Sequence, residues 1–355
     1  MRGLLGFIAF LVVAESLFRA LPVSTSTETG YYLDPLIVTY PPHHVWTSAT
    51  GWDLRNAQHH QSNNAGFLAH RDFRQESRAV ALIGDSFVEA SMLDAEERPG
   101  AQLERNLAGR PVFSMGGPGS ALLDYAERIR LAHSLYGVKD FVVVMERADI
   151  RQSLCGSRNI HGPCLSPTTL EARVETMPTA GLVKRIFRHS AFLQYSLSQL
   201  KVSVDQFWPP AFLSMNLAAA VAAVVPPTTF TGRQVNLPTS LTQEEMQSID
   251  AVSAKFFDTV KPLIEGNLVI VIDSDRRALY LGRPMADPAR DRFMTIARAA
   301  GAQVIDTASI FETSFGANGL KFDVGPYDTH FNALGIRLIS EAAALALEPR
   351  HGSRP

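Results

Sequence analysis

The chain has 355 residues and a formal net charge of −2, and 46% of its residues are apolar against 19% charged. These values are those of a globular protein with one large domain or two. A near-neutral charge without a basic stripe argues against a nucleic-acid partner. Ten histidines are present, but no cysteine or histidine spacing is typical of a metal site. We therefore expect neither a metal nor a cofactor.

The first 22 residues indicate export. Gly3 to Ala14 is a run of twelve residues without a charge, which is the length of a signal-peptide core and, with Leu17, Phe18 and Leu21 added, of a short membrane anchor. A small-x-small cleavage pattern is present at Ala14-Glu15-Ser16, but it follows the apolar run directly, so we favour an uncleaved anchor. Both alternatives place the protein on the periplasmic side, held to the inner membrane by its N-terminus or secreted after cleavage.

Residues 23–77 are predicted as a linker and an irregular extension. Ser24 to Gly30 is rich in serine and threonine, which is typical of an extended linker. The extension ends in Asn63-Asn64-Ala65-Gly66-Phe67, where turn chemistry accounts for the residues as well as a site role does.

The first strong element is the apolar run Ala79 to Ile83, which continues into Gly84-Asp85-Ser86. An unbroken apolar run of this length predicts a buried parallel strand, and open α/β sheets keep their chemistry at the carboxyl ends of such strands. Ser86 is therefore a candidate nucleophile, which needs a base and oxyanion donors. The alternative is a plain strand-to-helix turn in which Asp85 or Ser86 caps the next helix.

Strands and helices alternate beyond this point. Pro111 to Met115 predicts a second strand that ends at Gly116-Gly117, and a helix follows from Leu122 to Tyr136, closed by Gly137. Glycines at a strand end let a backbone amide approach a substrate closely, or they serve a tight turn, and both alternatives remain open.

A third predicted strand, Phe141 to Met145, leads to Glu146-Arg147-Ala148-Asp149 and then to the two cysteines. The segment between Cys155 and Cys164 is rich in turn-forming residues, and an oxidising compartment would join them, so we expect a disulfide.

The alternation breaks between residues 165 and 240. This region includes the apolar run Ala211 to Val225, which lies between two proline pairs and is too short to span a bilayer comfortably. We interpret residues 165–240 as a helical insertion that caps the sheet near the active site, rests on the membrane surface, or serves packing alone.

The alternation then resumes and gives five parallel strands in all. The predicted elements are a helix from Thr242 to Ile264, a strand from Asn267 to Ile272, a helix around Arg290 to Ala300, a strand from Gln303 to Ile305 and a final helix from Ala333 to Leu347. We assign residues 78–348 to one α/β domain and residues 349–355 to a tail.

A second polar cluster, Pro326-Tyr327-Asp328-Thr329-His330, lies just ahead of the final helix. In an extended segment, residues two apart point to the same side, so the Asp328 carboxylate can hold the His330 ring in one tautomer. These are the orienting group and the base that a nucleophilic serine needs. The alternative is a helix-capping turn, which we favour for Asn332.

Gly84-Asp85-Ser86 and Asp328-Thr329-His330 together resemble the first and last motifs of the SGNH (GDSL-type) hydrolase superfamily, although many members have two residues between the aspartate and the histidine. The Gly-x-Ser-x-Gly elbow of α/β-hydrolases is not found around Ser86. The resemblance implies a three-layer, flavodoxin-like α/β fold with a parallel sheet of about five strands and helices on both faces. It also implies Ser86, His330 and Asp328 as catalytic residues, and an oxyanion hole made by the amides of Ser86 and of Gly116 or Gly117.

One motif departs from the superfamily. Hydrolytic members usually carry Gly-x-Asn-Asp after the third strand, and Ala148 stands where that oxyanion-binding asparagine would be. The Glu146-Arg147 pair is similar to the strand end of the alginate O-acetylation proteins. Arg147 would donate in place of the asparagine or, as we favour, pair with Glu146 or Asp149. Asp85, Glu146 and Arg147 are thus candidate further contributors to the site.

The resulting prediction is an exported serine esterase that acts on acyl esters, acetyl esters of a carbohydrate above all, through an acyl-enzyme on Ser86. A polysaccharide O-acetyltransferase of the same fold and a non-catalytic carbohydrate-binding scaffold are the alternatives. The expected partners are an acylated carbohydrate or a small ester, the membrane through the N-terminal segment, and envelope polysaccharide machinery.

Overall fold

The structure is a computed structural model, and it describes residues 2–25, 28–157, 161–177, 181, 187–200, 240–325 and 328–348. The chain divides into two compact units. Unit 1 comprises residues 1–28, 44–61 and 178–235, and unit 2 comprises residues 29–43, 62–177 and 236–355. The apolar run Ala211 to Val225 and the predicted tail lie outside the described residues.

Unit 2 is built on the parallel sheet that the sequence predicts. In the described part of the chain, the order of its strands is β11-β10-β7-β5-β6, and all neighbouring pairs are parallel. This is the 2-1-3-4-5 order of flavodoxin-like sheets, whose switch point lies between β5 and β7. The predicted fold class is therefore confirmed. The strands are β5 (Val80–Gly84), β6 (Val112–Gly116), β7 (Asp140–Met145), β10 (Leu268–Ile272) and β11 (Gln303–Asp306).

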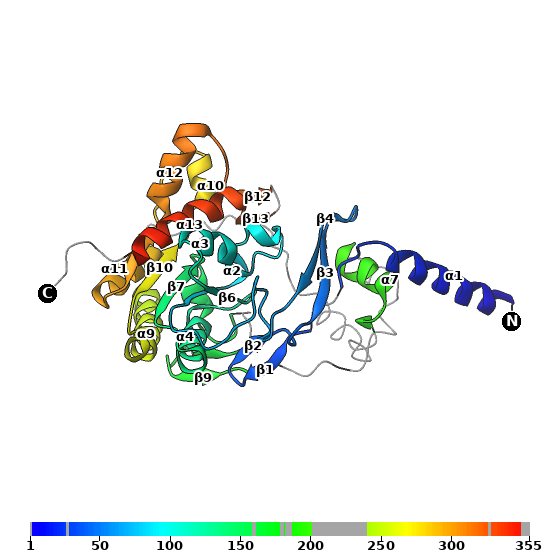
Figure 1. Cartoon of the computed structure of the whole chain (residues 1–355), viewed down its shortest axis with the longest axis horizontal. Helices are drawn as coiled ribbons and strands as arrows, with labels where there is room; N and C mark the ends of the chain where they lie inside the picture. Colours follow the sequence, from blue (N-terminus) through cyan, green and yellow to red (C-terminus); the bar gives the residue numbers. More distant parts are fainter. Residues whose placement is uncertain are drawn as a thin grey trace. The chain divides into compact units, whose positions relative to one another are not determined.

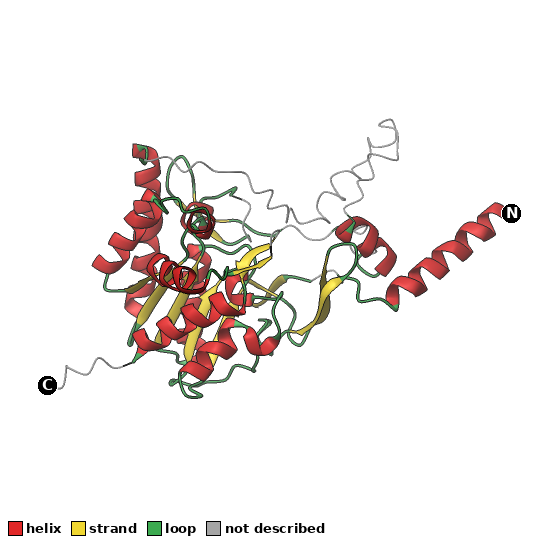
Figure 2. Ribbon diagram, turned by 90° about the horizontal axis from the view of Figure 1, so that it is seen from above, coloured by secondary structure: helices red, strands yellow, loops and turns green. Residues whose placement is uncertain are grey.

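Helices cover both faces of this sheet (Figure 2), because successive side chains of a strand point to opposite faces. Ala81 and Ile83 of β5 belong to one hydrophobic core, and Val80 and Leu82 belong to a second. The first core includes residues of α4 (Leu122–Tyr136), α9 (Gln243–Val260) and α11 (Pro288–Ala299). The second includes residues of α2 (Ser86–Glu89), α3 (Pro99–Asn106), α12 (Thr307–Asn318) and α13 (Ala333–Leu347).

Local signals set the helix ends as predicted. α4 ends at Gly137, which has a left-handed φ of 70°. α9 begins with a capping box, in which the Glu245 amide donates to Thr242 Oγ1 at 3.1 Å and the Thr242 amide donates to the Glu245 carboxylate at 2.9 Å. Asn332 caps α13, as predicted, by accepting from the Gly335 amide at 3.0 Å. Each such cap stabilises a helix by about 1 kcal/mol.

The helix α12 does not follow from the sequence patterns. Asp306 caps its start by accepting from the Ala308 amide at 2.7 Å, and Gly319, with φ 69°, ends it. Only Thr307 and Phe311 of this helix are buried, so its apolar pattern is too sparse to predict it. The other short elements of unit 2 are β1 (Gly30–Asp34), β2 (Ile37–Thr39), η1 (Ala95–Glu97), α5 (Asp149–Gln152), η5 (Lys261–Leu263), α10 (Arg276–Tyr280), β12 (Asp323–Gly325) and β13 (Asp328–Phe331).

The segment Asn63 to Phe67 is a turn. The Asn63 side chain accepts from the amides of Ala65 and Phe67, each at 3.0 Å. The Asn64 side chain exchanges two hydrogen bonds with the backbone of Phe73, at 2.8 and 2.9 Å. Both asparagines therefore shape the backbone, and of the two alternatives for this segment the structure favours turn chemistry.

The start of the predicted helical insertion is extended instead. β8 (Pro163–Leu165) and β9 (Ala172–Val174) form an antiparallel pair. Cys164 of β8 is joined to Cys155 by a disulfide with an S–S distance of 2.14 Å. The prediction of a helical insertion at about residues 165–240 therefore does not hold for residues 165–174, because this stretch pairs its backbone with a neighbouring strand.

Unit 1 contains α1 (Arg2–Arg19), the antiparallel strands β3 (Val45–Thr50) and β4 (Arg55–Gln61), and the short helical segments α7 (Ala191–Leu193) and η2 (Gln194–Gln199). Figure 1 shows α7 beside one end of α1. Within the described ranges, none of the helices has both the length and the apolar character that crossing a membrane requires.

Candidate active site

Ser86 and His330 meet at the carboxyl end of β5, although 244 positions separate them in the chain. β5 delivers Ser86 as the first residue of α2, and β13, paired antiparallel with β12, carries Asp328 and His330. His330 Nε2 lies 2.8 Å from Ser86 Oγ, and His330 Nδ1 lies 2.6 Å from Asp328 Oδ1. The structure thus brings together the three side chains that the two sequence motifs single out.

The Asp328 carboxylate fixes the tautomer of the His330 ring. Burial raises the pKa of Asp328, but the hydrogen bonds and charge of His330 outweigh this effect and hold the pKa below its ordinary value. An ionised carboxylate only accepts hydrogen bonds, so His330 Nδ1 carries the proton. The lone pair of Nε2 then faces the Ser86 hydroxyl, which can donate to it.

Aromatic side chains hold the histidine ring in place. The ring centroids of Phe87 and His330 are 5.0 Å apart, and those of Phe87 and Phe331 are 4.8 Å apart. Phe331 is 1% exposed. Phe87, which follows the nucleophile, therefore packs against the base, and Phe331, which follows the base, packs in turn against Phe87.

Asp85 serves the turn rather than the base. Its carboxylate accepts from the Phe87 amide at 2.8 Å and so caps α2. Burial raises the pKa of Asp85 to about 6. The capping alternative is thus correct for Asp85, whereas Ser86 is the first residue of the helix and is free to face His330.

Gly116, the last residue of β6, and Gly117, which follows it, differ in their contacts. The Gly117 amide donates to the Gly84 carbonyl oxygen at 3.1 Å, so the prediction of Gly117 as an oxyanion donor is wrong. A side chain on Gly116 would meet the backbone nitrogen of Glu89 at 2.3 Å, which explains the glycine by its close contact with α2. Gly116 and Ser86 remain the candidate donors.

Arg128, on α4, donates hydrogen bonds to the backbone at the carboxyl ends of β5 and β6. It was not among the residues that the sequence analysis singled out. Its side chain is 1% exposed. Nη1 donates to the Gly84 carbonyl oxygen at 2.7 Å and to Ser120 Oγ at 2.9 Å. These partners belong to other elements of the fold, so the pattern of α4 alone carries no signal for this role.

Arg147 forms ion pairs, as the sequence analysis favours. Its Nη1 lies 3.0 Å from Asp275 Oδ2, and its Nε lies 3.9 Å from Glu146 Oε1. Asp149 is not a partner, because its carboxylate accepts from the Tyr125 hydroxyl and from the Glu146 amide, each at 2.8 Å. The main partner is therefore an aspartate that follows the neighbouring strand β10.

The carboxyl group of Glu146 is turned toward its own loop. It accepts from the Ala148 amide at 2.5 Å, and burial raises its pKa to about 7. Burial likewise raises the pKa of Asp149 well above its ordinary value. These acids hold the loop after β7 in a folded turn.

Arg276 links β10 to the strand that carries the base. It is 6% exposed, pairs with Asp273 and Asp323, and donates to the Thr329 carbonyl oxygen at 2.6 Å. Its guanidinium lies 4.4 Å from the centroid of the Phe331 ring. Because Thr329 stands between Asp328 and His330, Arg276 is a positioning residue for both.

Replacing Arg276 by lysine should lower kcat for ester turnover by about 10- to 100-fold with little change in KM. The lysine ammonium group is a point charge and cannot bind all three partners of the planar guanidinium group, so His330 should move out of position. The measurement is steady-state kinetics across a range of pH. Arg277→Lys, at the exposed neighbouring position, is the matched control and should leave kcat unchanged. Equal turnover in the two variants would remove Arg276 from this role.

Glu89, at the end of α2, is a buried acid next to the nucleophile turn. It is 3% exposed and accepts from the Tyr40 hydroxyl at 3.0 Å. Burial raises its pKa from 4.5 to about 7. The pKa of Glu89 is thus higher in the folded protein than in the unfolded chain. Glu89 therefore favours the folded state most below pH 4.5, where it is protonated in both states, and this contribution is lost as the pH rises toward 7 and the buried group must ionise.

Glu89→Gln should therefore be more stable than the wild type at pH 8, by roughly 2–3 kcal/mol, and the gain should vanish at pH 4.5 and below. The glutamine oxygen can still accept from Tyr40, so the packing is kept. Urea unfolding at several pH values measures the difference. Glu312→Gln, at an exposed position of α12, is the control. A Glu89→Gln gain that does not change with pH would contradict this account.

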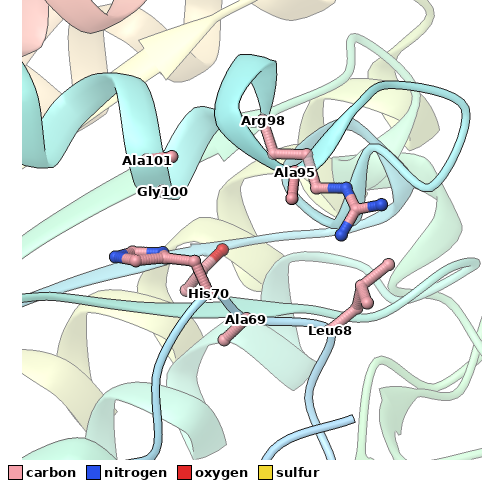
Figure 3. Close-up of a pocket in the computed structure, with 8 residues that line it drawn as sticks. Leu68, Ala69, His70, Ala95, Arg98, Gly100 and Ala101 are labelled. Carbon is pink, nitrogen blue, oxygen red and sulfur yellow. The ribbon is translucent and has the colours of Figure 1, made fainter. Parts of the chain in front are cut away.

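Unit 2 also contains a small pocket (Figure 3). None of Ser86, Asp328 and His330 lines it. Its lining residues are Leu68, Ala69, His70, Ala95, Arg98, Gly100, Ala101 and Ser114. The pocket is therefore not part of the cluster formed by these three side chains.

No protein-family model matches the sequence, and no curated protein matches it either. Among solved structures, the chain is similar to a member of the lipolytic protein G-D-S-L family from Veillonella parvula, with 10% identity, a TM-score of 0.39, and coverage of 77% of this chain and 98% of that one. It is also similar to the lipase/acylhydrolase from Enterococcus faecalis, with 11% identity, a TM-score of 0.34, and coverage of 78% and 100%.

A third similar structure is an alpha/beta hydrolase enzyme from the metagenome of Lake Arreo, with 13% identity, a TM-score of 0.35, and coverage of 78% of this chain and 99% of that one. Likeness at this level concerns the fold, and what the site can do follows from its own geometry. Structures of the GDSL type, which the two sequence motifs predict, are thus among those that this chain resembles.

Proposed function

We propose that the chain is a serine esterase that hydrolyses acyl esters through an acyl-enzyme on Ser86. The observation that carries the proposal is the unbroken line of hydrogen bonds from Ser86 Oγ to His330 Nε2 at 2.8 Å and from His330 Nδ1 to Asp328 at 2.6 Å. A nucleophile, a base and an orienting carboxylate at these distances form the arrangement that activates a serine hydroxyl.

The reaction has two halves. In the first, Ser86 Oγ attacks the ester carbonyl carbon while His330 Nε2 takes the hydroxyl proton, and His330 then gives this proton to the departing alcohol. In the second, water attacks the acyl-enzyme, and His330 again takes and returns a proton. The amides of Ser86 and Gly116 are the proposed donors to the oxyanion in both halves.

Acetyl esters of an exported carbohydrate are the proposed substrate class. The apolar N-terminal segment supports export, and the Glu146-Arg147 pair supports a polysaccharide setting through its similarity to alginate O-acetylation proteins. The same pair favours a second candidate, an O-acetyltransferase, in which a sugar hydroxyl replaces water in the second half. The two functions share the acyl-enzyme and differ only in the group that accepts the acyl chain.

The test is to treat the full chain in mild detergent with a fluorophosphonate and to measure its intact mass. One adduct on the wild type and none on Ser86→Ala is expected, because only an activated serine reacts at a useful rate. Supplying an acetylated oligosaccharide with an unacetylated one then separates release of acetate from transfer. A wild type that stays unlabelled while a control serine hydrolase reacts would overturn the proposal in favour of a binding role.

A further inference from the structure

The first turns of α1 in unit 1 present apolar side chains to every side. Leu4, Leu5, Phe7, Ile8, Phe10, Leu11, Val12 and Val13 are all exposed, from 37% for Leu11 to 66% for Val13. A helix that is apolar all round is stable only when something apolar surrounds it. In the described part of unit 1, Phe10 contacts Phe192 with ring centroids 6.2 Å apart, and much of the apolar surface of this helix stays exposed. The run Gly3 to Ala14 has twelve residues and is roughly 18 Å long, about the depth of one leaflet of a bilayer.

The other end of α1 is built into unit 1 by charged groups. The Glu15 carboxylate accepts from Ser190 Oγ at 2.7 Å and from the amides of Ala191 and Phe192 at 3.1 and 3.2 Å. These amides lie at the start of α7, so Glu15 caps a segment that is 175 residues away in sequence. Arg19 donates to Glu15 at 2.7 Å and to the His189 carbonyl oxygen at 2.9 Å.

Aromatic contacts continue from this junction. Phe18 stacks on Tyr195 with ring centroids 4.5 Å apart, and it lies 5.7 Å from Phe192. The Tyr195 hydroxyl donates to the carbonyl oxygen of Trp52, in the turn between β3 and β4, at 2.7 Å. The Trp52 side chain itself is 71% exposed. Aromatic residues thus gather where the apolar part of α1 ends, which is their preferred depth at a membrane–water interface.

We propose that unit 1 is a membrane-interface platform, in which an uncleaved α1 inserts Leu4 to Val13 into one leaflet of a lipid bilayer and Trp52 lies at the level of the headgroups. A lipid is the occupant that fits, because it surrounds a helix on all sides. A second helix or a protein groove would cover one stripe and leave the remaining apolar faces in water. The charged side chains that follow the apolar run, Glu15 and Arg19, come where the apolar surface stops, as an interface requires. The proposal does not depend on the chemistry of Ser86.

Flotation of the full chain with vesicles of phosphatidylethanolamine and phosphatidylglycerol (3:1) tests insertion. The wild type should float, and Phe7→Ser combined with Leu11→Ser should lower the bound fraction by about tenfold or more. The matched control is Leu281→Ser combined with Leu345→Ser, because these leucines of unit 2 are 53% and 69% exposed. The control should float like the wild type. A wild type that stays unbound, or one that instead forms a dimer lost in Phe7→Ser/Leu11→Ser, would overturn the proposal.

Two further measurements test the retained helix and the depth of Trp52. The intact mass of protein purified from its host's membrane fraction should include residues 1–22, and a chain that begins after Ser16 would contradict retention. Brominated acyl chains should quench part of the tryptophan fluorescence of the wild type, and Trp52→Phe should remove that part. The chain has three tryptophans, so unchanged quenching in Trp52→Phe would place the contact elsewhere and reject the platform.

Discussion

Replacing either Ser86 or His330 by alanine should lower kcat for p-nitrophenyl acetate by about four to six orders of magnitude. Without Ser86 no acyl-enzyme can form, and without His330 the hydroxyl keeps its proton, so the two single variants and the double variant should be almost equally inactive. This non-additivity is expected of residues that act as one unit. Steady-state kinetics and the burst of p-nitrophenolate that accompanies acyl-enzyme formation measure it.

The fold of these variants is the necessary control. Ser86→Ala removes one hydrogen bond, so its free energy of unfolding should change by only about 1 kcal/mol. His330→Ala also removes the hydrogen bond to Asp328 and the contact with Phe87, so it should lose more stability, roughly 2–3 kcal/mol. Ser309→Ala, at an exposed position of α12, should match the wild type in both activity and stability. Turnover that survives in folded Ser86→Ala would show that another group carries the reaction.

The sheet could be predicted because its strands are apolar on both faces. Val80 to Gly84 and Leu268 to Ile272 are buried throughout, which leaves unbroken apolar runs in the sequence. The final helix was bounded by an asparagine cap and matches its predicted range of Ala333 to Leu347. α12 could not be predicted, because a helix with so little buried surface leaves almost no periodic pattern.

The candidate site likewise contains residues that the sequence predicts and residues that it does not. Ser86, Asp328 and His330 stand in short motifs whose residue types already specify a chemistry, so sequence alone places them together. Arg128 and Arg276 do not, because a charged residue in the sequence is most often a solvated one. Their burial depends on carbonyl oxygens 44 and 53 positions away, at Gly84 and Thr329, and no local pattern reports such a contact.

In the loop after β7, the sequence predicts correctly that Arg147 is paired but does not predict its main partner. The sequence predicts that Arg147 is paired, since charges at strand ends are seldom left alone. The candidate partners were neighbours in the chain, whereas Asp275 follows β10, the strand adjacent to β7 in the sheet. In a parallel sheet the ends of neighbouring strands meet at one edge, so the partner of a strand-end charge is best sought at the end of the next strand in space.

Asp328→Asn should lower kcat by about four orders of magnitude while the protein stays folded, because it changes which nitrogen of His330 carries the proton. Asp328 accepts from the His330 backbone amide at 3.0 Å as well as from the ring. Both hydrogen bonds reach the same oxygen, Oδ1. When the asparagine NH₂ group takes this place, it faces Nδ1 as a donor and favours the tautomer with the proton on Nε2. The backbone hydrogen bond is then lost as well, which costs about 1 kcal/mol of stability.

In that tautomer His330 cannot accept the Ser86 proton, so the loss should appear in kcat and in the rate of fluorophosphonate labelling together. Both rates should recover in part at high pH, where hydroxide can replace the base. Asp323→Asn is the matched control. Asp323 lies on the adjacent strand β12, pairs with Arg276 and has no contact with the His330 ring. It should cost far less activity. If the two variants were equally impaired, the role of Asp328 would be to hold the hairpin, and the tautomer argument would fail.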